Sequence, residues 1–459
     1  MNALSAVLEA AAPIRVGEVR RAVGLSVDVS GLDCSIGDVL RLGGGGVGAA
    51  EHKSQSADES DLAEVVAVTE TVARCMPLGT ATAARTGMPV YHTGGPLMIP
   101  SGEGLLGRVL DGLGRPMDEL GPLRGVHMVP LENSVPHPLT RARITEPLST
   151  SVRTLDTLTT LGRGQRIGLF AGSGVGKSTL LSMIARGTDA EISVIALVGE
   201  RGREVREFIE DDLGPEGLAR SVVVVATSDQ PALVRSKAAF VATAIAAQFR
   251  AQGKDVVLMM DSLTRVAMAQ REIGLSVGEP PATRGYPPST FALLAELLEQ
   301  SGSAERGSVT GIYTVLVDGD DHNEPIADSA RSILDGHVVL DRKLAVSGHY
   351  PSIDSLASIS RVASKVLDPQ QKSDAAALRR YMAARASVQD LIDVGAYVAG
   401  TNPDADAALA FDAQIKGFLQ QATNDVTTFG DAWGRLRQIV ANLENHRASH
   451  QGQPGGARG

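Results

Sequence analysis

Residues 171–179 read Ala171-Gly172-Ser173-Gly174-Val175-Gly176-Lys177-Ser178-Thr179, and this stretch decides the fold of the chain. It follows the apolar run 167–170 and precedes the helix-like run 180–184. A glycine-rich loop between a strand and a helix lets several backbone N–H groups point at one anion, and the helix dipole adds positive potential. The pattern predicts a phosphate-binding loop for a nucleoside triphosphate. The alternative is an ordinary strand-to-helix turn that contains glycines.

Two side chains of this loop have expected chemical roles. Lys177 is expected to bring a positive charge to the outer phosphates, and the Ser178 hydroxyl is expected to be a ligand of Mg²⁺. The residues predicted to cradle the nucleotide are Gly172, Ser173, Gly174, Val175, Gly176, Lys177, Ser178 and Thr179.

Two further apolar runs end in carboxylates. Residues 256–260 lead to Asp261, and residues 192–199 lead to Glu200. Because ligands of open α/β sheets bind at the carboxyl ends of the strands, we expect both near the loop. Asp261 is predicted to hold Mg²⁺, with capping of the next helix as the alternative. Glu200 is predicted to polarise the attacking water, with a surface acid that begins a helix as the alternative.

Arg201, Arg203 and Arg265 follow the same strand ends. A guanidinium can bind a phosphate through two parallel hydrogen bonds. Arginines that are simply solvated are the commoner outcome, so both interpretations stay open for these three residues.

The composition disfavours several classes of protein. The chain has 459 residues, a net charge of −10 and only 3% aromatic residues, which disfavours broad nucleic-acid binding. Cys34 and Cys75 lack metal-ligand spacing, and free thiols are favoured over a disulfide. No apolar run approaches the length of a membrane span, and residues 1–7 lack the basic region of a signal peptide. We therefore expect a cytoplasmic location.

The pattern of apolar residues divides the chain into three parts. Residues 1–88 contain short alternating runs separated by glycines and acids, which predicts a small β domain, preceded by an amphipathic helix over residues 4–11. Residues 89–367 include apolar runs that alternate with helical stretches, which predicts an α/β fold with a parallel sheet. Residues 368–459 are predicted to be helical, with helices over 375–394 and 404–421 and a disordered tail from residue 451.

Several longer stretches resemble the rotary ATPase family: 171–179, 198–204 and 261–265. The stretches 278–289, 327–337 and 348–354 narrow the resemblance to the type III secretion ATPases. Within them, Asp328-Ser329-Ala330-Arg331 and Val394-Gly395-Ala396-Tyr397 resemble the flagellar export branch more than the virulence injectisome branch. The resemblance covers roughly residues 15–445.

This resemblance implies an α/β fold with a RecA-like P-loop ATPase core, an N-terminal small β-barrel and a C-terminal helical domain. Residues 107–116 resemble the connection between barrel and ATPase domain. The implied substrate is ATP with Mg²⁺.

The resemblance also implies roles for individual residues. Glu200 would act on the attacking water, Glu204 matches a nearby acid, and Arg265 would help to position the phosphates. Tyr350 would pack on adenine, although the residue alone could be a core aromatic. Arg361 would be the arginine finger of a neighbouring subunit, although from sequence alone it is an ordinary arginine.

The implied assembly is a homohexamer that couples ATP hydrolysis to chaperone release and delivery of export substrates. Its partners would be the flagellar export regulator, the central stalk protein, the export gate and chaperone–substrate complexes, with no nucleic acid. The location would be the cytoplasm, peripherally at the inner face of the cell membrane. No basic residue precedes Arg15, which weakens a lipid role because basic charge draws helices to anionic membranes.

Four alternatives remain beside this interpretation. They are an injectisome secretion ATPase, a catalytic subunit of a rotary ATP synthase, a ring helicase of the transcription-terminator type, and a non-catalytic structural subunit. The acidic composition disfavours the helicase. The carboxylate at Glu200 disfavours the non-catalytic subunit, because such subunits lack it.

Overall fold

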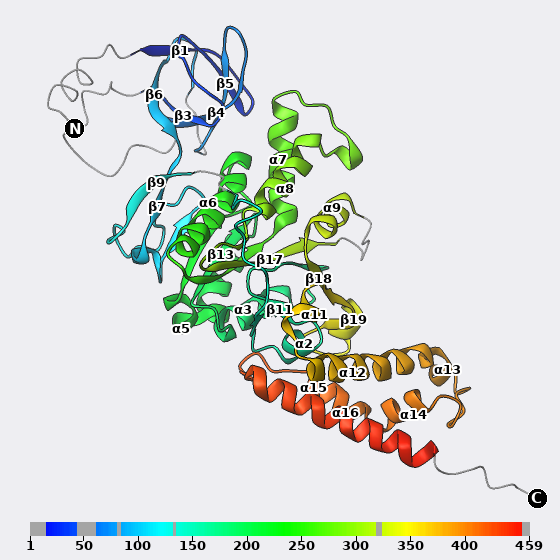
Figure 1. Cartoon of the computed structure of the whole chain (residues 1–459). Helices are drawn as coiled ribbons and strands as arrows, with labels where there is room; N and C mark the ends of the chain where they lie inside the picture. The colour runs from blue at the N-terminus through cyan, green and yellow to red at the C-terminus, as the bar shows by residue number, and fades with distance from the viewer. Residues whose placement is uncertain (1–14, 44–60, 80–83, 132–134, 318–323, 452–459) are drawn as a thin grey trace, which may run out of the picture.

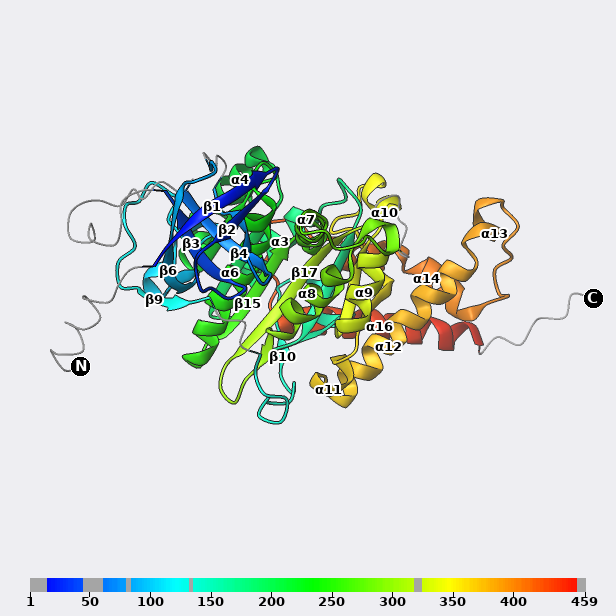
Figure 2. The ribbon, with the colours of Figure 1, turned by 90° about the horizontal axis from the view of Figure 1, so that it is seen from above.

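The computed structural model describes residues 15–43, 61–79, 84–131, 135–317 and 324–451. A β-barrel and a helical unit lie at opposite ends of a central α/β unit (Figures 1 and 2). The helix predicted over residues 4–11 and most of the predicted tail lie outside the described residues.

The barrel closes from six strands in the order β1-β2-β5-β4-β3-β6. Its interior is apolar because alternate residues of each strand point inward, as Val27 and Val29 do in β2. The strands are β1 (Val16–Val23), β2 (Ser26–Ser30), β3 (Asp38–Leu42), β4 (Leu62–Val68), β5 (Ala73–Pro77) and β6 (Pro89–Pro96).

The barrel extends past the limit predicted at residue 88. Its last strand, β6, begins at Pro89 and pairs with both β1 and β3. The sequence of β6 carries two prolines and two glycines, which are depleted in strands and typical of loops. Because of that composition, the sequence analysis did not include β6 in the barrel.

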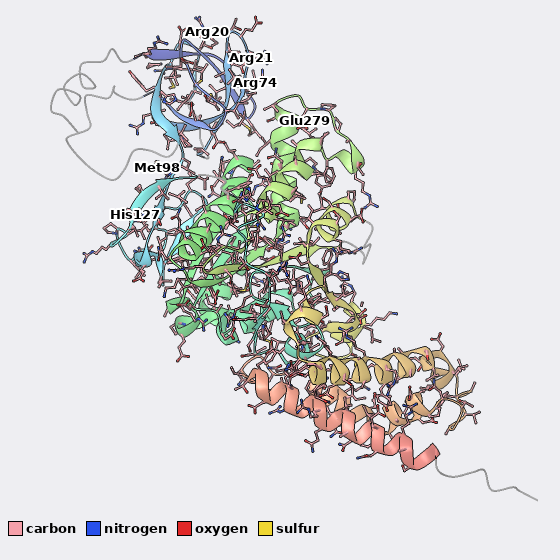
Figure 3. The ribbon with its side chains drawn as sticks, viewed as in Figure 1. Arg20, Arg21, Arg74, Met98, His127 and Glu279 are labelled. Atoms are coloured by element: carbon pink, nitrogen blue, oxygen red, sulfur yellow. The ribbon has the colours of Figure 1, made fainter. Side chains whose placement is uncertain are left out.

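Basic side chains on the barrel lie next to carboxylates. Figure 3 labels Arg20, Arg21 and Arg74 there. Arg74 Nε lies 2.9 Å from Asp28 Oδ1, and Arg21 Nε lies 4.0 Å from Asp28 Oδ2. Arg20 Nη1 lies 3.7 Å from a Glu18 oxygen. These arginines therefore do not form a purely positive surface.

The central unit contains a nine-stranded sheet in the order β19-β18-β12-β17-β15-β13-β14-β8, with β16 paired to β17. The strands are β8 (Val109–Asp111), β12 (Arg166–Ala171), β13 (Ile192–Val198), β14 (Ser221–Ala226), β15 (Asp255–Asp261), β16 (Gly302–Ser303), β17 (Ser308–Leu316), β18 (Gly336–Leu340) and β19 (Ile353–Ser360). Strands β8, β14, β13, β15, β17, β12 and β18 run parallel. The predicted parallel sheet is confirmed.

Both faces of this sheet are buried, which is why its strands read as continuous apolar runs. In β13, Val194 and Ala196 join the core that includes α6, α7 and α8. Ile195 and Leu197 join the core that includes α3 on the other face. The helices are α2 (Arg153–Thr157), α3 (Lys177–Gly187), α4 (Gly202–Glu207), α5 (Gly214–Ala219), α6 (Ala232–Ala251), α7 (Leu263–Ser276), α8 (Pro288–Glu299), α9 (Pro325–Ile333), α10 (Arg342–Val346) and α11 (Ala363–Val366).

Residues 107–116, expected as a connection, also supply an edge strand. β8 lies within them and pairs in parallel with β14. Two short ladders flank the central sheet: β7 (Met98–Ser101) with β9 (His127–Pro130), and β10 (Pro147–Leu148) with β11 (Leu161–Gly162). Figure 3 labels Met98 and His127 on the first of these ladders.

The C-terminal unit is helical, as predicted. Its helices are α12 (Pro369–Ser387), α13 (Gln389–Asp393), α14 (Pro403–Ala410), α15 (Asp412–Leu419) and α16 (Phe429–Gln451). The predicted helices 375–394 and 404–421 are each two helices, broken near Val388 and Phe411. Asp368 caps α12 through a reciprocal pair of hydrogen bonds with Gln371.

Both cysteines are free, as predicted. Cys75 is buried inside the barrel, and burial raises the pKa of its thiol to about 12, so the reactive thiolate is scarce. Among the described residues, no helix combines the length and the apolar character needed to cross a membrane.

Candidate active site at the carboxyl ends of the central strands

The glycine-rich loop connects β12 to α3, as predicted. Gly174 has a φ of 75° and Gly176 a φ of 91°, a left-handed conformation that residues with a Cβ atom avoid. Between them Val175 is buried, and its carbonyl accepts a hydrogen bond from Ser352 Oγ at 2.6 Å. The curled loop therefore sits at the N-terminus of α3, where unpaired backbone N–H groups attract anions.

Lys177 joins the two carboxylates that the sequence placed at strand ends. Its ammonium donates a hydrogen bond to Asp261 Oδ1 and another to Glu200 Oε1, the latter at 3.3 Å. Burial acts to lower the pKa of Lys177, but the charges of Asp261 and Glu200 outweigh it and raise that pKa. The ends of β12, β13 and β15 thus bring their charged residues to one point.

Asp261 is buried at the end of β15. Thr314 of β17 donates its hydroxyl to Asp261 Oδ1 at 2.8 Å. The residue that caps α7 is Ser262, whose side chain accepts a hydrogen bond from the backbone N–H of Arg265. The capping alternative for Asp261 is therefore wrong, because the next residue fills that position.

Glu200 lies between β13 and α4, and its side chain is only 15% exposed. Burial raises the pKa of Glu200, and the nearby Asp261 charge raises it further. A hydrogen bond between the side chains of Glu200 and Glu204 raises the pKa of Glu200 and lowers that of Glu204. The Glu200 carboxyl therefore holds a proton more readily than the Glu204 carboxyl does. Because the Glu200 side chain is largely buried, the alternative of an exposed surface acid is wrong for Glu200.

The three arginines after these strands differ in their surroundings. Arg201 and Arg203 are more than 80% exposed and pair with Glu204 and Glu207 of α4, which fits the solvated alternative. Arg265 instead lies against Gly199, where an added Cβ would meet its side chain at 2.9 Å. Its buried Nε has no hydrogen-bond partner among the described residues. Arg265 is thus the one of the three packed beside the Glu200 segment.

Tyr350 lies beside the phosphate loop. A Cβ added at Gly176 would meet the Tyr350 ring at 3.4 Å, so the ring and the loop backbone are in close contact. Tyr350 is 46% exposed, and the alternative of a core aromatic is therefore wrong. An exposed ring beside the loop offers a flat surface on which a base can stack.

Arg361 lies away from the loop of its own chain. It follows β19, and its backbone N–H donates to the carbonyl of Asp335 at 2.9 Å. Ser360 pairs with Gly336, whereas the loop end of β12 pairs with Leu340, four residues further along β18. Four residues of strand span roughly 13 Å. Arg361 is exposed and lies near the amino ends of the parallel strands, whereas the phosphate loop lies at their carboxyl ends.

Two further residues of the site were not singled out from the sequence. Thr314 supports Asp261, and Ser352 anchors Val175. Thr314 carried a signal, because it is a polar residue in the middle of the apolar run 312–317. Nothing near Ser352 in the sequence indicated its partner, which is 177 residues away.

Two known protein families match this chain, one within the central α/β unit and one within the C-terminal helical unit. Residues 151–360 match the ATP synthase alpha/beta family, nucleotide-binding domain, and residues 367–438 match the type III secretion EscN ATPase C-terminal domain.

Similar proteins cover nearly the whole chain. The flagellum-specific ATP synthase of Bacillus subtilis is 50% identical over 94% of this chain and 96% of its own length. The type 3 secretion system ATPase of Xanthomonas euvesicatoria is 47% identical over 93% of this chain and 94% of its own. The assembled ATPase EscN of enteropathogenic E. coli matches with a TM-score of 0.83 and 42% identity, over 92% of this chain and all of that one. The chain therefore belongs to the flagellum-specific and type 3 secretion ATPase family.

Proposed function

We propose that this ATPase hydrolyses Mg-ATP for the protein export apparatus of the bacterial flagellum, as a homohexamer whose neighbouring copies complete each other's sites. The observation that carries the proposal is the meeting of Lys177, Glu200 and Asp261 at the phosphate loop. The flagellar assignment is supported by five flagellum-specific relatives that are 42–50% identical to this chain, while three type 3 secretion system ATPases are 42–48% identical.

The residues present fit a magnesium ion. Ser178 is exposed in the first turn of α3, and the Asp261 carboxylate lies beside Lys177 at the same strand ends. Hydroxyl and carboxylate oxygens are the ligands that Mg²⁺ prefers. When bound, the metal would neutralise charge on the phosphate oxygens.

The chain's own residues divide the remaining work. Phosphates entering the loop would compete with Asp261 and Glu200 for the Lys177 ammonium, which would release both carboxylates. The ionised Glu200 carboxylate would then accept a hydrogen bond from the attacking water and orient it. Arg265 would steady the phosphates from the Gly199 side, and Tyr350 would stack on adenine.

A second copy would supply the missing cation. Because Arg361 lies near the amino ends of the strands of its own sheet, away from its own phosphate loop, it would serve the site of a neighbour. An arginine finger is typically worth about 10³–10⁵ in rate. A monomer would accordingly be a poor ATPase.

The proposed partners are the export regulator, a central stalk protein, the export gate and chaperone–substrate complexes. The solved complex of EscN with its central stalk EscO supports the stalk. The proposed location is the cytoplasm, peripherally at the inner face of the cell membrane.

Assembly-dependent activity is the first test of this proposal. ATPase rate is measured against protein concentration, with light scattering alongside to follow the size of the particles. We expect specific activity to rise steeply as rings form, because only rings bring Arg361 to a site. Specific activity that stayed flat from monomer to ring would overturn the shared-site part of the proposal.

The export system is tested in the source bacterium. Deletion of the chain should abolish flagellar assembly, and a plasmid copy should restore it. A deletion strain that swims normally but no longer secretes effector proteins would assign the chain to an injectisome instead.

A further inference from the structure

The loop between α15 and α16, residues 420–428, is bonded directly to the nucleotide site. The backbone N–H of Gln421 donates to the carbonyl of Tyr350 at 2.9 Å. Two residues after Gln421, the carbonyl of Thr423 accepts a hydrogen bond at 2.7 Å from the guanidinium of Arg186, which lies in the last turn of α3. The C-terminal helical unit therefore contacts both the backbone of Tyr350 and the helix that begins at the phosphate loop.

A buried arginine fastens this loop to the central unit. Arg153 in α2 is 4% exposed. Its guanidinium donates to the Phe418 carbonyl at 2.9 Å, to the Asp425 carboxylate at 2.6 Å and to the Thr427 hydroxyl at 3.1 Å. It also donates to the Gln420 carbonyl. Because the buried guanidinium forms hydrogen bonds to all four of these residues, it holds the loop in one conformation.

The side chain of Gln421 closes the same network. It is 5% exposed. Its carbonyl oxygen accepts from the Arg153 backbone N–H at 2.9 Å, and its amide donates to the carbonyls of Ser151 and Asp425 at 2.7 and 2.6 Å. Both amide protons and the oxygen are thus used inside the protein, so this side chain holds the loop and is not available to a ligand.

The network reaches both ends of α3. The Ser151 hydroxyl donates to the carbonyl of Gly187, the last residue of α3, at 2.7 Å. At the other end of α3, Gly176 precedes Lys177 and contacts the Tyr350 ring. The loop 420–428 therefore bridges the two ends of the helix that carries the phosphate-binding lysine.

We propose that Gln421 is a positioning residue for nucleotide binding. By fixing the loop, it keeps its own backbone N–H on the Tyr350 carbonyl, and so keeps the ring against Gly176 where a base can stack. The inference rests on the proposed role of Tyr350 in base binding. Since α16 begins at Phe429, directly after the loop (Figure 1), the same bonds link occupancy of the base site to the C-terminal helices.

The test is the ATPase kinetics of Gln421→Leu, which keeps much of the volume but removes the three side-chain hydrogen bonds. We expect the KM for ATP to rise about tenfold, because base stacking is lost or weakened, with kcat within about twofold in assembled rings. Inorganic tripolyphosphate, which has no base, should inhibit the variant and the wild type with the same inhibition constant. Gln420→Leu is the matched control, since that adjacent side chain is exposed, and it should leave KM unchanged.

A double-mutant cycle with Tyr350→Ala separates positioning from a general structural effect. Tyr350→Ala should raise KM, and adding Gln421→Leu should raise it no further. If Gln421→Leu does not fold, Gln421→Asn withdraws the amide by one carbon and should give the same pattern. The inference would be overturned if Gln421→Leu raised the KM for ATP equally in the wild type and in Tyr350→Ala. It would also be overturned if tripolyphosphate inhibited the Gln421→Leu variant more weakly than the wild type. An unchanged KM in Tyr350→Ala would overturn the adenine role itself, and the inference with it.

Discussion

Glu200 lies next to the lysine of the phosphate loop, and its pairing with Glu204 predicts the pH dependence of the reaction. Burial raises the pKa of Glu200, and its hydrogen bond to Glu204 raises that pKa further. Glu200 must be ionised to polarise water. Activity should therefore fall on the acid side at a pH above the ordinary glutamate pKa of about 4.3.

Glu204→Ala should move this acid limb to lower pH. The substitution removes both the hydrogen-bond acceptor that stabilises protonated Glu200 and a nearby negative charge, and each loss lowers the pKa of Glu200. The measurement is kcat at saturating Mg-ATP against pH. Glu207→Ala is the control, because Glu207 is half exposed and pairs with Arg203 on the same helix. An acid limb that moves upward, or moves equally in the control, would contradict the assignment.

At the scale of residues, the sequence was most informative where chemistry and local pattern coincide. The loop 171–179, Glu200 and Asp261 were found because each follows an apolar run. Their mutual contacts could not be derived, because Lys177 and Asp261 are 84 residues apart. The contacts of Gln421 with Tyr350 and Arg153 could not be predicted from the sequence either, because these partners lie in other elements.

At the scale of elements, continuous apolar runs located strands of the central sheet that are buried on both faces, but the strands β6 and β8 escaped the sequence analysis. The run 192–198 is continuously apolar because its residues alternate between two apolar cores, one on each side of the sheet. β6 and β8 were missed or misread because they are rich in proline or flanked by glycine. In those segments turn-forming residues obscure a strand that the rest of the barrel or sheet imposes.

The helix α16 provides a prediction about stability. Leu436 is fully buried in a cluster with Leu378 and Tyr381 of α12. Leu436→Ala should lower the free energy of unfolding by about 2–5 kcal/mol, through lost burial and a cavity. The single tryptophan, Trp433, is buried in the same helix, so urea denaturation can be followed by its fluorescence.

Val394→Ala is the matched control for Leu436→Ala. Val394 is 76% exposed, and surface substitutions usually change stability by less than about 0.5 kcal/mol. Equal urea midpoints for the two variants would mean that α16 does not hold the C-terminal unit together in this way.

At the scale of the whole molecule, the chain has its candidate site at one end of the parallel strands and an exposed arginine near the other end. The phosphate loop, Glu200 and Asp261 lie at the carboxyl ends of the parallel strands, whereas Arg361 lies near their amino ends. A head-to-tail contact between identical copies joins such unlike surfaces, and it closes into a ring when the rotation allows. We propose on this ground that each working site is shared by two copies.

The most direct test of that claim mixes two inactive variants. Glu200→Gln removes the catalytic carboxylate, and Arg361→Ala removes the finger, so rings of either variant alone should be nearly inactive. In mixed rings about a quarter of the interfaces would pair an intact Glu200 with an intact Arg361 from the neighbour. We expect the ATPase rate of the mixture to exceed clearly the sum of the two separate rates. A mixture no more active than that sum, in rings shown to contain both variants, would contradict it.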